Sequence, residues 1–270
     1  MEKRLDGQLG AIFPSAWPAI LSRISEIDEL KGWWRGRFHP PPAYLSVLRK
    51  KTTAISARAS IGIDWVGLPL RRDELGPVEP PARAEEVRRA TAASYAQLLR
   101  TVFDGQAEMP LTRELLLKFH ADLLRYSPRD QAHRGMYRFT HDHSAFFRRK
   151  SVESIALRPS EPDSIEREMS NLFEWTKSRL GTAECHPLIV VACFVLEFLA
   201  IRPFAAGNGR TSRLLTNLLL MRCGYSYLPY ASLEKVIAER KAEYYLALRK
   251  SQASRHLLRA DMGPWLTAFL

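Results

Sequence analysis

The residues of this sequence that are best suited to chemistry lie between two strongly apolar segments, at positions 201–213. The Gly-Asn-Gly run at Gly207–Gly209 can adopt backbone angles that other residues avoid, and directly before a helix it can turn several N–H groups toward one point. The helix dipole strengthens this field, so the arrangement favours an anion. Arg210 and Arg213 are three residues apart and therefore share a helix face beside that point. Two guanidinium groups next to a cluster of amides suit a diphosphate or triphosphate.

A second interpretation of the same residues is structural. In it, Gly207–Gly209 is only a turn between packed helices, and the two arginines are solvated. The residues alone leave both interpretations open. A Walker-type phosphate loop is excluded, because the spacing from glycine to lysine and the lysine itself are absent.

Helices must position this segment, because apolar residues recur every three to four positions along most of the chain. The longest apolar run, 188–201, contains Glu197 and is shorter than the roughly 20 residues that a membrane span needs, so it predicts a buried helix. We expect an all-α fold with helices at 17–30, 42–58, 83–104, 112–126, 162–180, 187–201, 208–223, 232–251 and 262–270.

Two stretches interrupt the helical pattern. Residues 67–82 are rich in proline and arginine, so we expect a linker that divides the chain into an N-terminal helical segment, 1–82, and a domain, 83–270. Residues 134–160 mix aromatic, threonine and histidine residues without a helical period. They predict a short β-hairpin that stands outside the helical body.

The segment 201–213 resembles the signature of the Fic (Fido) family, written His-Pro-Phe-x-(Asp or Glu)-Gly-Asn-Gly-Arg-x-x-Arg. The positions that match it are Pro203, Phe204, Gly207, Asn208, Gly209, Arg210 and Arg213. Three further stretches are similar to family features and extend the resemblance over roughly residues 85–270: Gly135-x-Tyr137-Arg138, His186-Pro187 and Glu243-Tyr244-Tyr245.

This resemblance implies an all-α domain that binds ATP at the Gly-Asn-Gly loop and transfers AMP to a hydroxyl group of a target protein. In the family, the motif histidine is the general base and the acidic residue holds Mg²⁺. The asparagine, the glycine-rich backbone and the two arginines hold the phosphates, and a hairpin flap aligns the target by strand addition. The resemblance places Phe139, Thr140, His141 and His143 in that target-docking flap.

The two residues that the family uses for chemistry are the two that differ here. Arg202 occupies the histidine position, and a guanidinium group has no lone pair to accept a proton. Ala206 occupies the acidic position and cannot ligate a metal, so Mg²⁺ is not expected. Loss of a positioned base alone costs about 10²- to 10⁴-fold in rate. We therefore expect a degenerate Fic protein that binds ATP or another nucleotide without a metal, with weak or absent AMP transfer.

A third difference concerns the inhibitory (Ser or Thr)-x-x-x-Glu-(Gly or Asn) motif of many Fic proteins, whose glutamate pairs with the second motif arginine. The nearest stretch here is 56–61, which places Ser60 at the glutamate position. Asp64 is four residues further on and out of register, so we do not expect it to substitute. The joint loss of base, metal ligand and inhibitor favours a pseudoenzyme.

The strongly positive net charge leaves functions other than nucleotide binding open. There are 40 Lys and Arg against 29 Asp and Glu, a formal net charge of +11, which predicts an anionic partner. One alternative is an active nucleotidyl- or phospho-transferase that uses a base outside the motif. Another is a protein-interaction or DNA-associated module with a vestigial loop. The expected partners are a nucleotide and a protein target or regulatory partner; no motif supports DNA, and no membrane is expected.

The remaining signals restrict the class of protein. Cys185, Cys193 and Cys223 show no paired spacing, which excludes a disulfide scaffold and a zinc ribbon. Residues 1–10 are polar and adjoin no apolar stretch, so we expect no signal peptide and a cytoplasmic location. The apolar pattern continues to Leu270, which is compatible with a domain cut from a longer protein.

Overall fold

A computed structural model describes residues 5–7, 12, 14–37, 40–64, 81–127, 130–140, 159–182, 184–253 and 261–270. All the regular elements in these ranges are helical, so the predicted all-α fold is confirmed. The elements are η1 (Pro14–Ala16), α2 (Trp17–Gly36), α3 (Pro42–Asp64), α4 (Pro81–Gly105), α5 (Arg113–Leu123), η4 (Pro162–Ser164), α6 (Ile165–Thr182), α7 (Pro187–Ile201), α8 (Asn208–Arg222), η5 (Leu228–Tyr230), α9 (Leu233–Glu239), α10 (Lys241–Ala253) and α11 (Gly263–Phe269).

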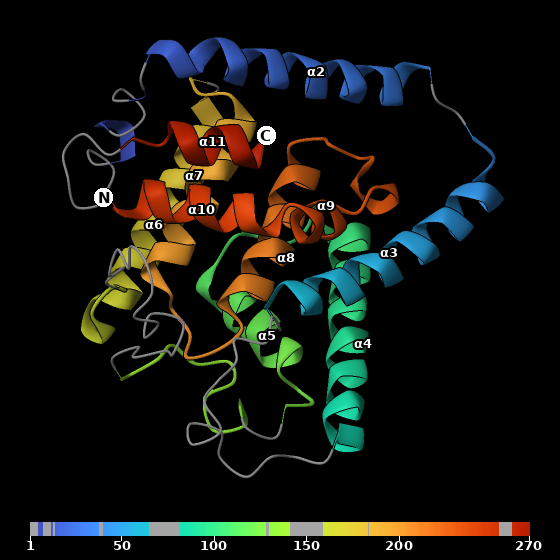
Figure 1. The fold of residues 1–270 in the computed structure, drawn as a ribbon, viewed down its shortest axis with the longest axis vertical. Coiled ribbons are helices and arrows are strands. Elements are labelled where there is room, and N and C mark those ends of the chain that lie inside the picture. Colours follow the sequence, from blue (N-terminus) through green and yellow to red (C-terminus); the bar gives the residue numbers. More distant parts are fainter. Residues whose placement is uncertain are drawn as a thin grey trace.

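Helix α7 is the predicted buried helix and forms the centre of the core. Every residue from Leu188 to Phe198 is buried, and α6, α8, α10 and α11 pack around this helix (Figure 1). Burial of one leucine or phenylalanine side chain contributes about 1.5–3 kcal/mol to folding, so α7 fixes the framework from which the 202–207 loop projects. No helix within the described ranges is long and apolar enough to cross a membrane.

The N-terminal helices bring a second segment to this loop. Helix α2 lies across one end of the body (Figure 1), where Asp28 accepts a hydrogen bond from the Tyr225 hydroxyl at 2.8 Å and pairs with His186 at 2.9 Å. Helix α3 packs against α4, α8 and α9. The C-terminal end of α3 therefore lies beside the beginning of α8.

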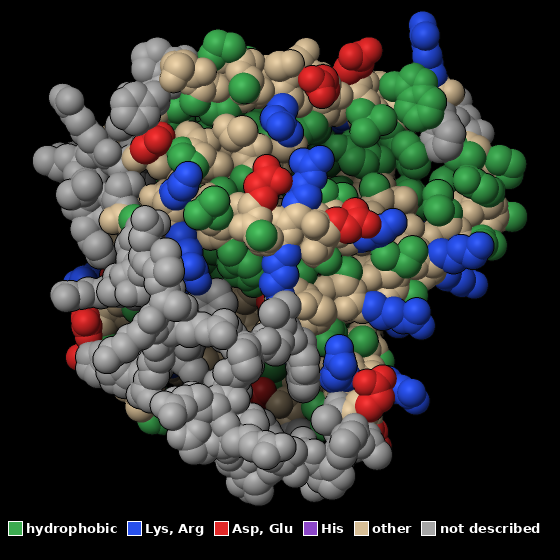
Figure 2. Space-filling model, in the orientation of Figure 1, with side chains coloured by type: hydrophobic (Ala, Val, Ile, Leu, Met, Phe, Trp, Pro, Cys, Tyr) green, Lys and Arg blue, Asp and Glu red, His purple; other side chains and the backbone are tan. Residues whose placement is uncertain are grey.

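Basic side chains do not gather in one patch on the visible face of the molecule. Figure 2 shows Lys and Arg spread over many elements, with Asp and Glu among them over the middle of this face. The net charge of +11 is therefore distributed on this side, and nothing in this view resembles the single basic stripe that favours a nucleic acid.

Two details differ from the sequence-based expectations. The predicted helix 232–251 is two helices, because Arg240, at φ −106° and ψ 28°, ends α9. The break lets α9 pack on α3 while α10 packs on α7 and α11. The predicted hairpin is not confirmed: residues 137–139 form no strand, and 141–158 lie outside the described residues, as does the expected linker from 67 to 80.

Candidate functional site

The loop that joins α7 to α8 contains two left-handed residues. Arg202 has φ 50° and ψ 66°, and Gly207 has φ 77° and ψ 4°. A left-handed conformation costs a residue other than glycine about 1–2 kcal/mol, so Arg202 is strained while Gly207 is not. The first helical bond of α8 runs from the Thr211 N–H to the Gly207 carbonyl at 2.9 Å. The N–H groups of residues 208–210 precede this bond and have no acceptor within the helix, as the anion-site interpretation requires.

Asn208 and Phe204 hold the loop closed. The Asn208 side chain accepts a hydrogen bond from the Phe204 N–H at 3.0 Å and donates one to the Phe204 carbonyl at 2.7 Å. The Phe204 ring is fully buried and stacks on His120 at a centroid distance of 3.7 Å. The resemblance places both residues among those expected to bind the nucleotide or its phosphates. In this structure their side chains position the loop, and the Asn208 N–H stays available to an anion.

His120, which the sequence analysis did not single out, is a further positioning residue. Its Nδ1 accepts a hydrogen bond from the Gly135 N–H at 2.9 Å, so Nε2 carries the proton and donates to the Ala206 carbonyl at 3.0 Å. Mainly because of burial, the pKa of His120 falls to about 4. The ring is neutral at pH 7 with both nitrogens engaged, so it holds the loop and is not a free general base. A signal was present: a histidine on the apolar face of the helix at 112–126 needs hydrogen-bond partners.

This low pKa predicts that the protein loses stability as the pH falls from 6.5 to 4. The unfolded chain binds a proton at His120 near pH 6.5 and the folded chain only near pH 4, so between these values the unfolded state binds more protons. The contribution is complete above pH 6.5, and about 3 kcal/mol is lost by pH 4. Chemical denaturation across this range should show the loss in the unmodified chain and a smaller one in His120→Gln. Equal slopes for the two proteins would contradict the assignment.

Arg213 is buried beneath the first turn of α8 and is held from α3. Its Nε donates to the Ser60 hydroxyl and its Nη2 to the Ser60 carbonyl, both at 2.9 Å. Burial lowers the pKa of Arg213, but Asp64 and the tyrosines Tyr95, Tyr245 and Tyr244 together more than offset this, so the pKa lies above its ordinary value. Ser60 thus contacts the arginine that an inhibitory glutamate would contact, but with neutral oxygens.

Asp64 supplies the negative charge that Ser60 lacks. Its Oδ2 lies 3.0 Å from Arg213 Nη2 and 3.3 Å from Arg210 Nε. The expectation that Asp64 is out of register is therefore wrong, because residues four apart lie on the same face of a helix and the Asp64 side chain reaches the same arginine as Ser60. Gly209 permits the approach: a Cβ atom there would lie only 2.8 Å from Asp64 Oδ1.

Two buried donors at the start of α8 lack a hydrogen-bond acceptor within the described residues. They are Arg210 Nε, whose 3.3 Å contact with Asp64 does not have hydrogen-bond geometry, and Thr211 Oγ1. A buried donor without an acceptor costs about 1–3 kcal/mol. An anion bound at the beginning of α8 could supply the acceptor for Arg210.

Arg138 fastens the expected flap to the loop. Its guanidinium group is buried and donates to backbone carbonyls on both sides, among them Thr140 at 3.0 Å and Arg202 at 2.8 Å. The Arg138 N–H also donates to the Pro203 carbonyl at 2.9 Å. Phe139 is 76% exposed and Thr140 is exposed. His141 and His143, which were expected in the same flap, lie outside the described residues.

The residues present do not fit Mg²⁺. Ala206 stands at the position where the family signature has a metal-binding carboxylate. It offers only its backbone carbonyl, and this carbonyl already accepts a hydrogen bond from His120. The Asp64 carboxylate is engaged by two guanidinium groups. Within the described ranges, no group of three His, Cys, Asp or Glu side chains is arranged to hold a metal.

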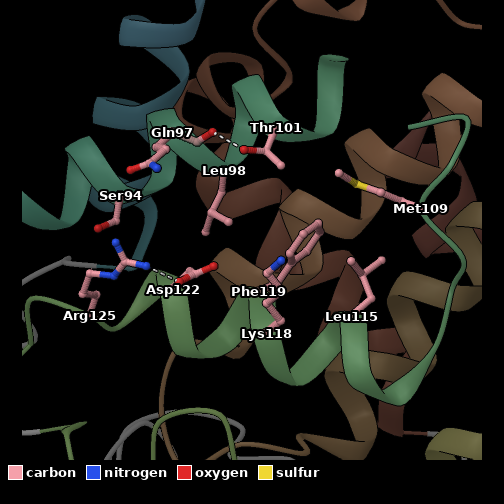
Figure 3. A pocket seen from close by; sticks show the side chains of 10 residues that line it. All are labelled: Ser94, Gln97, Leu98, Thr101, Met109, Leu115, Lys118, Phe119, Asp122 and Arg125. Carbon is pink, nitrogen blue, oxygen red and sulfur yellow. Dashed lines mark hydrogen bonds and ion pairs between the residues drawn. The ribbon is translucent and has the colours of Figure 1, made fainter. Parts of the chain in front are cut away.

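A cavity of about 250 Å³ lies elsewhere, between α4 and α5. Figure 3 shows Leu98 and Phe119 pointing toward one another across it, with Lys118 and the Asp122–Arg125 ion pair on the α5 side. No residue of the 202–213 segment lines it. Lys118 therefore offers a basic residue that can be changed without touching the loop.

The comparisons with known proteins identify the domain that carries this loop. Residues 110–220 match the model of the Fic/DOC family, so this part of the chain is a Fic domain. The predicted resemblance is thereby confirmed.

The similar proteins agree with this assignment. A stretch of 79 residues, 29% of this chain, is 39% identical to the protein adenylyltransferase Fic of Drosophila willistoni, of which it covers 16%. Two solved structures share the fold. A Fic family protein from Desulfovibrio desulfuricans G20 has a TM-score of 0.62 at 23% identity, and the match covers 93% of this chain and 70% of the bacterial chain. Fic-1 from C. elegans has a TM-score of 0.67 at 18% identity, and the match covers 95% of this chain and 70% of the Fic-1 chain.

Proposed function

We propose that this Fic domain binds the phosphates of ATP or another nucleotide at the beginning of α8, without Mg²⁺, and transfers AMP weakly or not at all. The observation that carries the proposal is the buried Arg210 Nε, which has no hydrogen-bond acceptor among the described residues. The N–H groups of residues 208–210 and the positive end of the α8 dipole support it. The relatives named as adenylyltransferases support a nucleotide as the ligand.

The chemistry of the loop argues against efficient transfer. The guanidinium group of Arg202 has no lone pair to accept a proton, so it cannot take a proton from a target hydroxyl group. His120, the histidine that contacts the loop in the described part of the chain, already uses both ring nitrogens. These residues can bind and orient phosphates, and none of them is placed to remove a proton.

The remaining roles follow the sequence-based expectations and stay predictions. Arg202, Arg210 and Arg213 would balance the phosphate charge, with Arg213 acting from beneath α8. Phe139 and Thr140 would belong to a flap that meets a protein target or a regulatory partner. The division at residue 82 and the cytoplasmic location are likewise predictions.

Calorimetric titration with ATP, with and without Mg²⁺, tests the proposal. We expect binding in both buffers and about tenfold or greater weakening in Arg210→Ala, because a charge-assisted hydrogen bond to phosphate is lost. Lys118→Ala is the matched control, since it removes one positive charge at the α4–α5 cavity. Absence of ATP binding, or equal weakening in the two variants, would refute a phosphate site at the loop.

A further inference from the structure

Before its last turn, helix α3 buries small residues and exposes large apolar ones, whereas Ile61 and Ile63 at its C-terminal end are buried. Its buried positions over the middle of the helix are Thr52, Thr53, Ser56, Ala57 and Ser60. Tyr44, Val47 and Ile55, by contrast, are 56%, 53% and 45% exposed. A surface helix ordinarily turns its large apolar face toward the core. The reversed arrangement over residues 44–58 leaves an apolar face that another molecule could cover.

The exposed residues follow one line along the helix. Tyr44, Val47, Lys51, Ile55 and Arg58 are separated by three or four positions, the spacing of a helix-packing seam, and all five are exposed. We call these five residues the α3 stripe. At 1.5 Å per residue the stripe is about 21 Å long. The N-terminal half of α3 projects from the body in Figure 1, and Figure 2 shows apolar and basic side chains over it.

The part of the chain that carries the stripe has only basic charged side chains, of which Arg49 is paired with Asp104 of α4 at 2.6 Å. Residues 30–63 contain no Asp or Glu, and their basic residues are Lys31, Arg35, Arg37, Arg49, Lys50, Lys51 and Arg58. A second copy of this chain, paired through the same stripe, would offer no carboxylate to Lys51 or Arg58. Nucleic acid phosphates would complement the two basic residues but not the three apolar ones. Acidic residues that alternate with apolar ones match the whole stripe.

We propose that the α3 stripe binds an acidic amphipathic helix of a partner protein. Apolar side chains of that helix pack on Tyr44, Val47 and Ile55, and its carboxylates face Lys51 and Arg58. This is the helix-in-groove mode of recognition, in which apolar anchors provide affinity and charges fix the register. The proposal is independent of nucleotide binding, because the five residues lie on the face of α3 opposite to Ser60.

A designed peptide provides the probe. It is a fluorescently labelled helix of about three heptads with leucine at positions a and d and glutamate at e and g, and its binding is followed by anisotropy. We expect the unmodified chain to bind it. Lys51→Glu with Arg58→Glu should weaken binding about tenfold or more, because two attractive pairs become repulsive. A peptide with lysine in place of glutamate should prefer the reversed variant.

Three controls locate and classify the interaction. Arg167→Glu with Lys177→Glu makes the same change of charge on exposed positions of α6 and should leave peptide binding unchanged. Tyr44→Ser with Val47→Ser tests the apolar part and should also weaken binding. Thermal unfolding and ATP titration should be unaffected in every variant, since all the changed side chains are exposed and none belongs to the loop.

Several outcomes would overturn the proposal. They are failure of the acidic peptide to bind, equal loss in the α6 control, and indifference to the Tyr44 and Val47 changes. Duplex DNA or anionic vesicles that bind through Lys51 and Arg58, with no contribution from the apolar residues, would also overturn it and would assign the surface to that ligand.

Discussion

Asp64→Asn should bind ATP more tightly than the unmodified chain, by about 10- to 100-fold. The Asp64 carboxylate lies 3.0 Å from Arg213 and 3.3 Å from Arg210, where it neutralises the charge that phosphates would use. It also repels any anion bound at the beginning of α8. The asparagine side chain keeps the shape and removes the charge. Calorimetry on the two proteins measures the difference, and higher salt should reduce it.

A second carboxylate–arginine pair serves as the control for this prediction. Asp104 pairs with Arg49 at 2.6 Å, so Asp104→Asn changes the net charge equally without touching the motif arginines. Its ATP affinity should be that of the unmodified chain. If Asp64→Asn bound ATP no better than Asp104→Asn, the carboxylate would not compete with phosphate. Arg210→Ala in the Asp64→Asn background should remove most of the gain.

The sequence predicted the helical fold because the features that determine it are local and repetitive. The apolar run at 188–201 could only be buried, and capping residues marked several helix ends. The break at Arg240 was missed because the apolar period continues through it. Only the tertiary contacts of α9 with α3, and of α10 with α7 and α11, require the chain to bend there.

The candidate site was predictable where it depends on consecutive residues and not where it depends on distant ones. The Gly207–Gly209 loop and the helix start after it follow from the local sequence. The contacts of Asp64 and His120 with the loop join segments more than 80 residues apart, and no periodicity encodes them. The role of the Asn208 side chain was not predictable either: its chemistry suits a phosphate, but in the structure it hydrogen-bonds the Phe204 backbone and closes the loop.

Restoration of the two divergent residues should produce the largest change in activity. We expect Arg202→His with Ala206→Asp to transfer AMP to itself or to a test protein at least about 10²- to 10⁴-fold faster than the unmodified chain, the range that a positioned base provides. The backbone at 202 is already fixed, because Arg138 donates to the Arg202 and Pro203 carbonyls. Histidine also tolerates the left-handed conformation of Arg202 better than most residues do. Ala206 is partly exposed, which leaves room for a carboxylate.

The control variants separate the two restored functions. Arg202→Gln with Ala206→Asp restores the carboxylate without a base, and Arg202→His with Ala206→Asn restores the base without a carboxylate. Both should transfer far less labelled AMP than the double variant, whose rate should rise with pH through the ordinary pKa of histidine near 6.5. Robust transfer by the unmodified chain would refute the pseudoenzyme hypothesis, because a base outside the motif would then be at work. No transfer by a double variant that still binds ATP would show that divergence extends beyond these two positions.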